Sequence, residues 1–179
     1  APALLAAWLD RMEVRQAAWV GHSMGGRVVA ELAADAPERV ARLVLVAAAI
    51  FPAAGGWTLR VRGLPGAVRH VPPTLLPVVA IDAARAGPRT LLRASRSLLA
   101  SGAESRLPDI AAPTLVVWGE HDALVPLPYG ERVASLIPSA RLVVLPSADH
   151  TPMWGRARAF NAHVLGFLAE GCADGDAWR

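Results

Sequence analysis

Residues 17 to 36 constrain the fold of this 179-residue chain more than any other stretch. Ala17 to Val20 is apolar and predicts a strand, the segment Gly21-His22-Ser23-Met24-Gly25-Gly26 follows it, and a helical pattern then continues until Pro37. A strand, a sharp turn and a helix are expected in that order. Small residues two before and two after the turn serine let strand and helix pass closely, and Gly21 and Gly25 occupy these positions.

Such a turn has chemical consequences for the two residues at its apex. It leaves the hydroxyl of Ser23 exposed, and it places the backbone N–H of Met24 at a helix N-terminus, where developing negative charge is favoured. The pattern therefore predicts a nucleophile elbow, with Met24 N–H as one donor of an oxyanion hole. Because Gly and Ser also form ordinary loops, partners for the serine have to be found elsewhere.

Two further apolar runs end in loops that carry a carboxylate and an imidazole. Thr114 to Trp118 predicts a buried strand that leads to Asp122, and Arg141 to Leu145 predicts another that leads to His150. The carboxyl ends of parallel strands lie along one edge of a sheet, so these loops and the elbow are expected to converge. The order serine, acid, histidine is the one expected for this elbow.

Several neighbouring residues compete for these roles. Glu120 is the nearest alternative acid, but it lies closer to the strand end and is less favoured. Asp149 is expected to be an exposed turn residue without a catalytic role. The side chain of His22 is expected to point away from the site and pack locally. The other histidines are expected to take no part in catalysis: His70, His121 and His163.

The three motifs together resemble the α/β-hydrolase family. The segment 21–26 stands where its elbow stands, Gly119-Glu120-His121-Asp122 where its acid loop stands, and Asp149-His150 where its histidine loop stands. The resemblance implies that Ser23 is the nucleophile, Asp122 the orienting acid and His150 the general base, with no metal and no organic cofactor. It covers both ends of the chain but not residues 51–110.

Two variants of the family fit less well. Some members place the acid after the preceding strand, here residues 43–46, but residues 47–60 contain neither Asp nor Glu. Others, such as the haloalkane dehalogenases and epoxide hydrolases, use an Asp nucleophile, which the serine at position 23 disfavours.

Alternating strands and helices predict an α/β fold, the C-terminal part of an α/β-hydrolase fold, with a mostly parallel sheet and helices on both faces. The continuous Val/Leu runs predict strands buried on both sides. We expect a core at 1–50, a lid insert at 51–110 and a second part of the core at 111–179. The expected helices are 2–12, 24–35, 128–137 and 156–170, and the expected strands are 17–20, 42–47, 114–118 and 141–145.

The expected insert differs in composition from the core. Pro and Gly punctuate it, it carries eight Arg, and apolar residues between 75 and 81 predict short helices. Its arginines could hold a carboxylate-bearing substrate, although a solvated face is the favoured interpretation. Trp57, Trp118 and Trp154 are expected to pack rather than stack on a ligand, with Trp154 within reach of the pocket rim.

The start of the chain predicts a fragment of a longer protein. Ala1 is not Met, and residues 2–12 resemble the helix that directly precedes the elbow strand in the family. The strands expected before it, and the loop that often carries His-Gly and donates the second oxyanion N–H, would then lie outside this sequence. We also expect an apolar edge at the strand 17–20, which would favour aggregation and poor folding in isolation.

Composition limits the partners. All 18 basic residues are Arg and the formal net charge is only +3, so no nucleic-acid partner is expected. The longest apolar run, near residues 43–51, is too short to span a bilayer. The single Cys172 cannot form an internal disulfide, which favours a cytoplasmic location, although a signal peptide outside this sequence would allow secretion.

The expected partner is a small-molecule substrate, and the expected activity is that of a serine hydrolase. It would cleave a carboxylic ester or a related acyl bond of a small or medium apolar substrate through an acyl-enzyme. The alternatives on the same triad are hydrolysis of a carbon–carbon bond in a diketone-like acid, of a thioester or of an amide, and perhydrolysis. A non-catalytic ligand-binding member of the fold is the remaining alternative.

Overall fold

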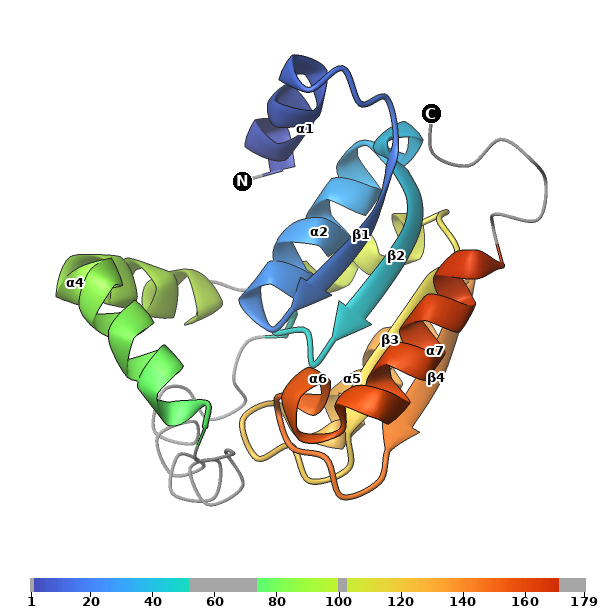
Figure 1. Ribbon diagram of the computed structural model, residues 1–179. Coiled ribbons are helices and arrows are strands. Elements are labelled where there is room, and N and C mark those ends of the chain that lie inside the picture. Colours follow the sequence, from blue (N-terminus) through green and yellow to red (C-terminus); the bar gives the residue numbers. More distant parts are fainter. Residues whose placement is uncertain (1, 52–73, 100–102, 171–179) are drawn as a thin grey trace.

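Four parallel strands form one sheet in the order β1-β2-β3-β4 in the computed structural model, which describes residues 2–51, 74–99 and 103–170. Helices lie on both faces of this sheet (Figure 1), so the predicted α/β fold class is confirmed. The strands are β1 (Ala17–His22), β2 (Val40–Val46), β3 (Thr114–Gly119) and β4 (Ala140–Leu145). The helices are α1 (Pro2–Arg11), α2 (Met24–Asp35), α4 (Leu76–Leu99), α5 (Leu127–Leu136), α6 (Pro152–Gly155) and α7 (Ala157–Ala169), with 3₁₀ turns η1 (Pro37–Arg39) and η2 (Glu104–Asp109).

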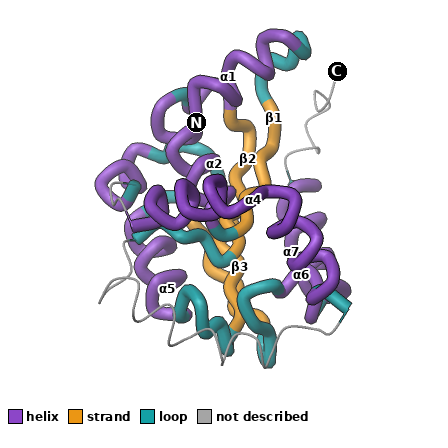
Figure 2. The backbone as a smooth tube through the Cα atoms, turned by 90° about the vertical axis from the view of Figure 1, so that its left-hand side faces the viewer, coloured by secondary structure: helices purple, strands orange, loops and turns teal. Residues whose placement is uncertain are grey.

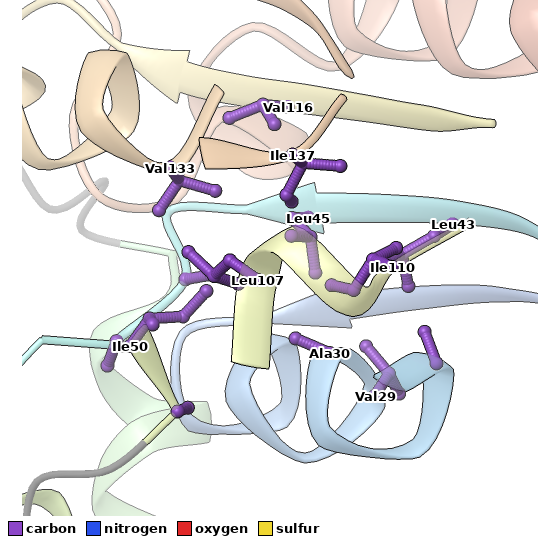
Figure 3. Packing of buried hydrophobic residues seen from close by; sticks show 14 of the residues in the cluster. Val29, Ala30, Leu43, Leu45, Ile50, Leu107, Ile110, Val116, Val133 and Ile137 are labelled. Carbon is purple, nitrogen blue, oxygen red and sulfur yellow. The ribbon is translucent and has the colours of Figure 1, made fainter. Parts of the chain in front are cut away.

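The two central strands divide the hydrophobic core into two layers. Successive side chains of a strand point to opposite faces, so Leu43 and Leu45 of β2 pack with α2, α5 and η2, whereas Val44 and Val46 pack with α7. Figure 3 shows the first layer from close by, and Figure 2 shows the sheet with α5 on one side and α7 on the other. The two layers bury the central strands up to their carboxyl ends.

The two outer strands depart from the expectation that all strands are buried on both sides. β1 and β4 each pair with a single neighbour in the described sheet and are partly exposed, with Val20 50% and Val144 37% exposed. β2 and β3 match the expectation, because a neighbour on each side and a helix layer on each face cover them. The apolar edge predicted at β1 is present.

The described part of the expected insert contains the turn η2 and α4, which consists of two helical segments and so agrees with the short helices expected there. α4 is interrupted at Gly87, whose φ of 74° is a left-handed conformation that suits glycine, and Pro88 follows directly. Both ends of the expected insert pack into the core, where Phe51, Leu107 and Ile110 are buried.

The remaining differences lie at element ends. The expected helix 156–170 begins a residue later, and the extra short helix α6 lies directly before it. No helix among the described ranges combines the length and apolarity needed to cross a bilayer. The expectations for Trp57, His70 and Cys172 fall outside the described residues.

Candidate active site

The turn between β1 and α2 holds its serine in a strained conformation. Ser23 has φ 52° and ψ −116°, which non-glycine residues seldom adopt. The end of β2 and the loop after it hold this conformation on both sides, because Ser23 N–H donates to Val46 O at 2.9 Å and Ala49 N–H donates to Ser23 O at 2.9 Å. Met24 then opens α2, so its N–H has no carbonyl partner within the helix.

The close passage of strand and helix is present, but the positions that require glycine differ from the expected pair. A Cβ on Gly21 would collide with Val29 and would lie 2.7 Å from Gly25 O. On Gly25 a Cβ would meet nothing within 4 Å, which corrects the role expected there. Gly26 is the second crowded position, since its Cβ would lie 2.7 Å from the Cβ of Ala48. The helix therefore turns Gly26, and not Gly25, toward the sheet.

The acid loop after β3 carries Asp122, whose carboxylate is fully buried. Its Oδ1 accepts the N–H groups of Leu124 and Val125 at 2.9 and 2.8 Å, so the loop itself orients the side chain. The indole of Trp118 donates to Val125 O at 2.7 Å and ties that loop to β3. The second oxygen, Oδ2, is left to face the histidine loop.

The histidine loop after β4 completes a chain of three side chains. His150 Nδ1–H donates to Asp122 Oδ2 at 2.8 Å, and His150 Nε2 lies 3.1 Å from Ser23 Oγ. Because the carboxylate can only accept, Nδ1 carries the proton and Nε2 is free to accept the serine O–H. The residues that the sequence singled out at three strand ends are thus brought within hydrogen-bonding distance.

The competing acids are placed differently from one another. Glu120 Oε2 accepts Ser147 N–H at 2.9 Å, so this side chain braces the backbone of the histidine loop and leaves His150 to Asp122. Asp149 was expected to be exposed, but it is 8% exposed. Its Oδ1 accepts both the N–H and the O–H of Thr151, while its buried Oδ2 has no hydrogen-bond partner. The main chain of Asp149 passes close to Gly119 at the end of β3, where a Cβ would collide with the main-chain oxygen of Asp149.

His22 also departs from the expectation. Its ring lies against the ring of His150, with centroids 4.8 Å apart, and its Nε2–H donates to the main-chain oxygen of His150 at 2.8 Å. Burial, and next the nearby His150, lower the pKa of His22 below its ordinary value. Only the position beside the serine could have drawn attention to this residue, because its partner is 128 positions away.

The remaining candidates lie outside this chain of hydrogen bonds. His121 is exposed in the acid loop, and His163 is exposed on α7. Trp118 is buried in the core, as expected, and the exposed Trp154 on α6 donates from its indole N–H to Thr74 Oγ1 at 3.0 Å. Within ranges 2–51, 74–99 and 103–170, no group of three or more His, Cys, Asp or Glu residues is arranged so that it could hold a metal ion.

This arrangement has the parts needed for nucleophilic catalysis. It contains a hydroxyl on a strained turn, an imidazole whose free nitrogen faces that hydroxyl, and a buried carboxylate that fixes the imidazole tautomer. A backbone N–H at a helix N-terminus lies on the residue next to the hydroxyl.

Comparison with known proteins adds a family and several relatives. A model of the Alpha/beta hydrolase family matches residues 1–163. The chain is 29% identical, over 186 aligned positions, to a 2-hydroxy-6-oxononadienedioate/2-hydroxy-6-oxononatrienedioate hydrolase from a Pseudomonas species. That match covers 90% of this chain and 66% of the relative, so the chain spans just under two thirds of the relative's length.

Solved structures match over nearly the whole chain. The meta-cleavage product hydrolase CumD of Pseudomonas fluorescens IP01 has a TM-score of 0.73 at 24% identity, covering 93% of this chain and 69% of that one. An esterase from Exiguobacterium antarcticum has a TM-score of 0.79 at 17% identity, covering 93% and 72%. At these identities the structural matches establish similarity of fold.

Proposed function

Because this chain belongs to the alpha/beta hydrolase family, we propose that it is a serine hydrolase that uses Ser23, His150 and Asp122 as its catalytic triad. The observation that carries the proposal is the continuous hydrogen-bonded path from Ser23 Oγ through His150 to the buried Asp122. A turn serine without a chemical role would need neither a base 127 residues away nor a strained φ.

Each residue of the triad has a distinct role in this proposal. Ser23 Oγ attacks a carbonyl carbon while His150 Nε2 takes its proton, and Asp122 holds the imidazole tautomer and stabilises its charged form. The N–H of Met24 donates a hydrogen bond to the developing oxyanion. A water molecule, activated by His150, then releases the acyl group. Neither a metal nor an organic cofactor takes part.

Hydrolysis of a carbon–carbon bond is the first candidate for the substrate class. The Pseudomonas relative is named for a 2-hydroxy-6-oxo dienedioate. That compound contains carboxylates, a hydroxyl and a ketone but no ester or amide bond, so a hydrolase that acts on it has to cleave next to the ketone. We extend this class, a 2-hydroxy-6-oxo dienoic acid, to the present chain.

The same three side chains account for every proton and electron pair in such a cleavage. In the keto form of the substrate, Ser23 adds to the C6 carbonyl, and its proton passes to His150. The tetrahedral intermediate collapses, the bond from C6 to C5 breaks, and the electron pair is delocalised into the conjugated carbonyl as a dienolate. The dienolate takes the proton from His150, and water then hydrolyses the acyl-enzyme to a carboxylic acid.

Cleavage of a carboxylic ester is the second candidate. It requires only a nucleophile, a base and an oxyanion donor, and the apolar side chains exposed on α4 favour an apolar acyl group. Those side chains are Leu76, Val78, Val79 and Ile81.

We further propose that α4 belongs to a lid, within the insert 51–110, over the site. The strand arrows of β1 and β2 point toward the side of the molecule where α4 and α6 lie (Figure 1). The indole of Trp154, four residues after His150, donates to Thr74 just before α4. This bond supports a connection between the insert and the histidine loop.

The triad is tested with a fluorophosphonate probe, which reacts with activated serines. We expect stoichiometric labelling of Ser23 in the protein and none in Ser23→Ala, because the probe needs the hydroxyl and its base. His150→Ala should lose labelling, whereas the exposed His163→Ala should keep it. A folded protein that remains unlabelled contradicts the proposal and favours a ligand-binding member of the fold.

The substrate class is tested by direct comparison of two assays. We expect loss of the absorbance that arises from the dienol and the conjugated 6-oxo group of a 2-hydroxy-6-oxo dienoic acid. The kcat/KM for this substrate should exceed that for nitrophenyl esters of increasing chain length. Ser23→Ala is the control in both assays. A labelled protein that cleaves only the esters would leave the triad intact and transfer the proposal to the second candidate.

A further inference from the structure

We propose that His22 is a positioning residue that ties the turn carrying the nucleophile to the loop carrying the base. The inference rests on the proposed function, since it concerns the alignment of Ser23 with His150. His22 directly precedes the serine in the sequence, and in the fold its ring lies against the histidine loop.

The hydrogen bond between His22 and His150 does not involve the ring nitrogens of His150. Both ring nitrogens of His150 are already engaged, Nδ1 by Asp122 and Nε2 by Ser23. His22 Nε2–H instead donates to the main-chain oxygen of His150 at 2.8 Å. A carbonyl oxygen can only accept, so the hydrogen resides on Nε2 of His22. His22 therefore holds the backbone of the base without competing for its imidazole.

This bond closes a small ring of interactions around the reacting pair. His22 and Ser23 are consecutive residues, and both bond to the single residue His150, one to its main chain and one to its side chain. The distance from His150 Nε2 to Ser23 Oγ is therefore held by the His22 bond to the His150 backbone as well as by the side-chain hydrogen bond itself. Alignment of this kind matters, because a misplacement of about 1 Å can lower a rate roughly 100-fold.

The charge state of His22 fits the same role. Burial of the ring, followed by the charge of His150, lowers the pKa of His22, while the hydrogen bond to the His150 main chain, Asp122 and Asp149 act in the opposite direction. At neutral pH the ring is a neutral donor. It can therefore hold the loop without placing a second positive charge against the imidazolium that forms on His150 during acylation.

The test separates the hydrogen bond from the ring packing. In His22→Gln the amide Nε2–H stands near the position of the original donor, while in His22→Phe the ring remains and the donor is lost. With the fluorophosphonate probe, we expect the maximal inactivation rate to fall roughly 10- to 100-fold in His22→Phe, with an unchanged binding constant, and to stay within about threefold of the parent in His22→Gln.

The controls separate the possible failures. His163→Phe and His163→Gln make the same changes on an exposed helix face and should leave both constants unchanged. If His22→Phe does not fold, His22→Met removes the donor with a side chain that adapts to irregular space. Equal inactivation rates in the parent and the donor-free variant would overturn the positioning role alone. An unlabelled parent protein would overturn the proposed function, and the positioning role with it.

Discussion

At the scale of single residues, the backbone orients the candidate triad as much as the side chains orient one another. Ser23 is held by hydrogen bonds on both sides of its peptide unit, and one oxygen of Asp122 is occupied by two loop N–H groups. His150 is held through its main-chain oxygen by His22. Little reorganisation is then needed when charge develops, which is the condition under which fixed dipoles stabilise a transition state best.

The crowding at Gly21 leads to a stability prediction. Gly21→Ala places a methyl group against Val29 and the backbone of α2, and we expect a loss of roughly 1–3 kcal/mol, as for overpacked cores. Gly166→Ala is the matched control, because its Cβ would meet nothing within 4 Å in α7 and should be neutral or stabilising. Urea unfolding measures both. Equal stabilities would mean that strand and helix can separate without cost.

The lowered pKa of His22 predicts a dependence of stability on pH. Above the ordinary His pKa of about 6.5 the ring is neutral in both states. As the pH falls through that value, the unfolded chain takes up a proton that folded His22 binds only at its own lower pKa, so stability falls until that pKa is reached. His22→Gln should therefore lose less stability than the parent between about pH 7.5 and about pH 5.5.

This pH dependence is measured by urea unfolding across that range. The groups that act on the His22 ring are His150, Asp122 and Asp149, and they are retained in the variant. His163→Gln, which removes an exposed imidazole, should follow the parent. A parent and a His22→Gln variant with the same pH dependence would contradict the assigned neutral state of His22.

At the scale of elements, β3, the acid loop and α5 form one packed unit. Trp118 is fully buried in β3, its indole bonds to Val125 in the acid loop, and its ring faces Gly130 of α5 so closely that a Cβ there would lie 2.6 Å away. Helix α5 thus packs directly on the Trp118 ring of β3. The position of Asp122 depends on this unit rather than on the local loop sequence alone.

Removal of the indole N–H tests the unit. Trp118→Phe leaves Val125 O without this buried donor, and we expect a loss of roughly 1–3 kcal/mol. The labelling rate at Ser23 should fall as well, because the loop that orients Asp122 is loosened. Trp8→Phe is the control, since that ring is exposed on α1. A Trp118→Phe variant with lower stability but an unchanged labelling rate would separate core packing from the site.

At the scale of the whole molecule, the described sheet has an exposed apolar strand at one edge. β1 pairs only with β2 among the described strands, and Val20 is 50% exposed. Helix α1 adds the exposed apolar side chains of Leu4 and Trp8, and Met12, directly after the helix, adds another. An unpaired apolar edge of this kind can pair with another chain.

A charge on this strand should reduce self-association. We expect Val20→Lys to lower the fraction of aggregated protein in size-exclusion chromatography, because charged side chains on edge strands oppose pairing between sheets. Val144→Lys adds the same charge on β4, where Val144 is 37% exposed, and should have a smaller effect. If both substitutions lower the aggregated fraction equally, the effect comes from net charge rather than from the edge at β1.

Much of the fold could be predicted because each element carries its own periodic signal. The apolar runs of β2 and β3 and the glycine-rich turn at 21–26 specify strands and an elbow locally. Ser23, Asp122 and His150 could be named because each lies in the turn or loop that follows a predicted strand. The burial of Asp149 and the inward turn of His22 could not be predicted, since both depend on which loops meet across the sheet edge.

The sequence by itself determined the alternating α/β order, the strained serine turn and the identity of the three side chains, because all of these follow from residue types at short spacing. Only the tertiary structure decided that Gly26 rather than Gly25 faces the sheet, that Asp149 is buried, and that His22 bonds to the backbone of His150. These properties arise where distant segments pack together, and the free energy of such contacts depends on a geometry that no local pattern encodes.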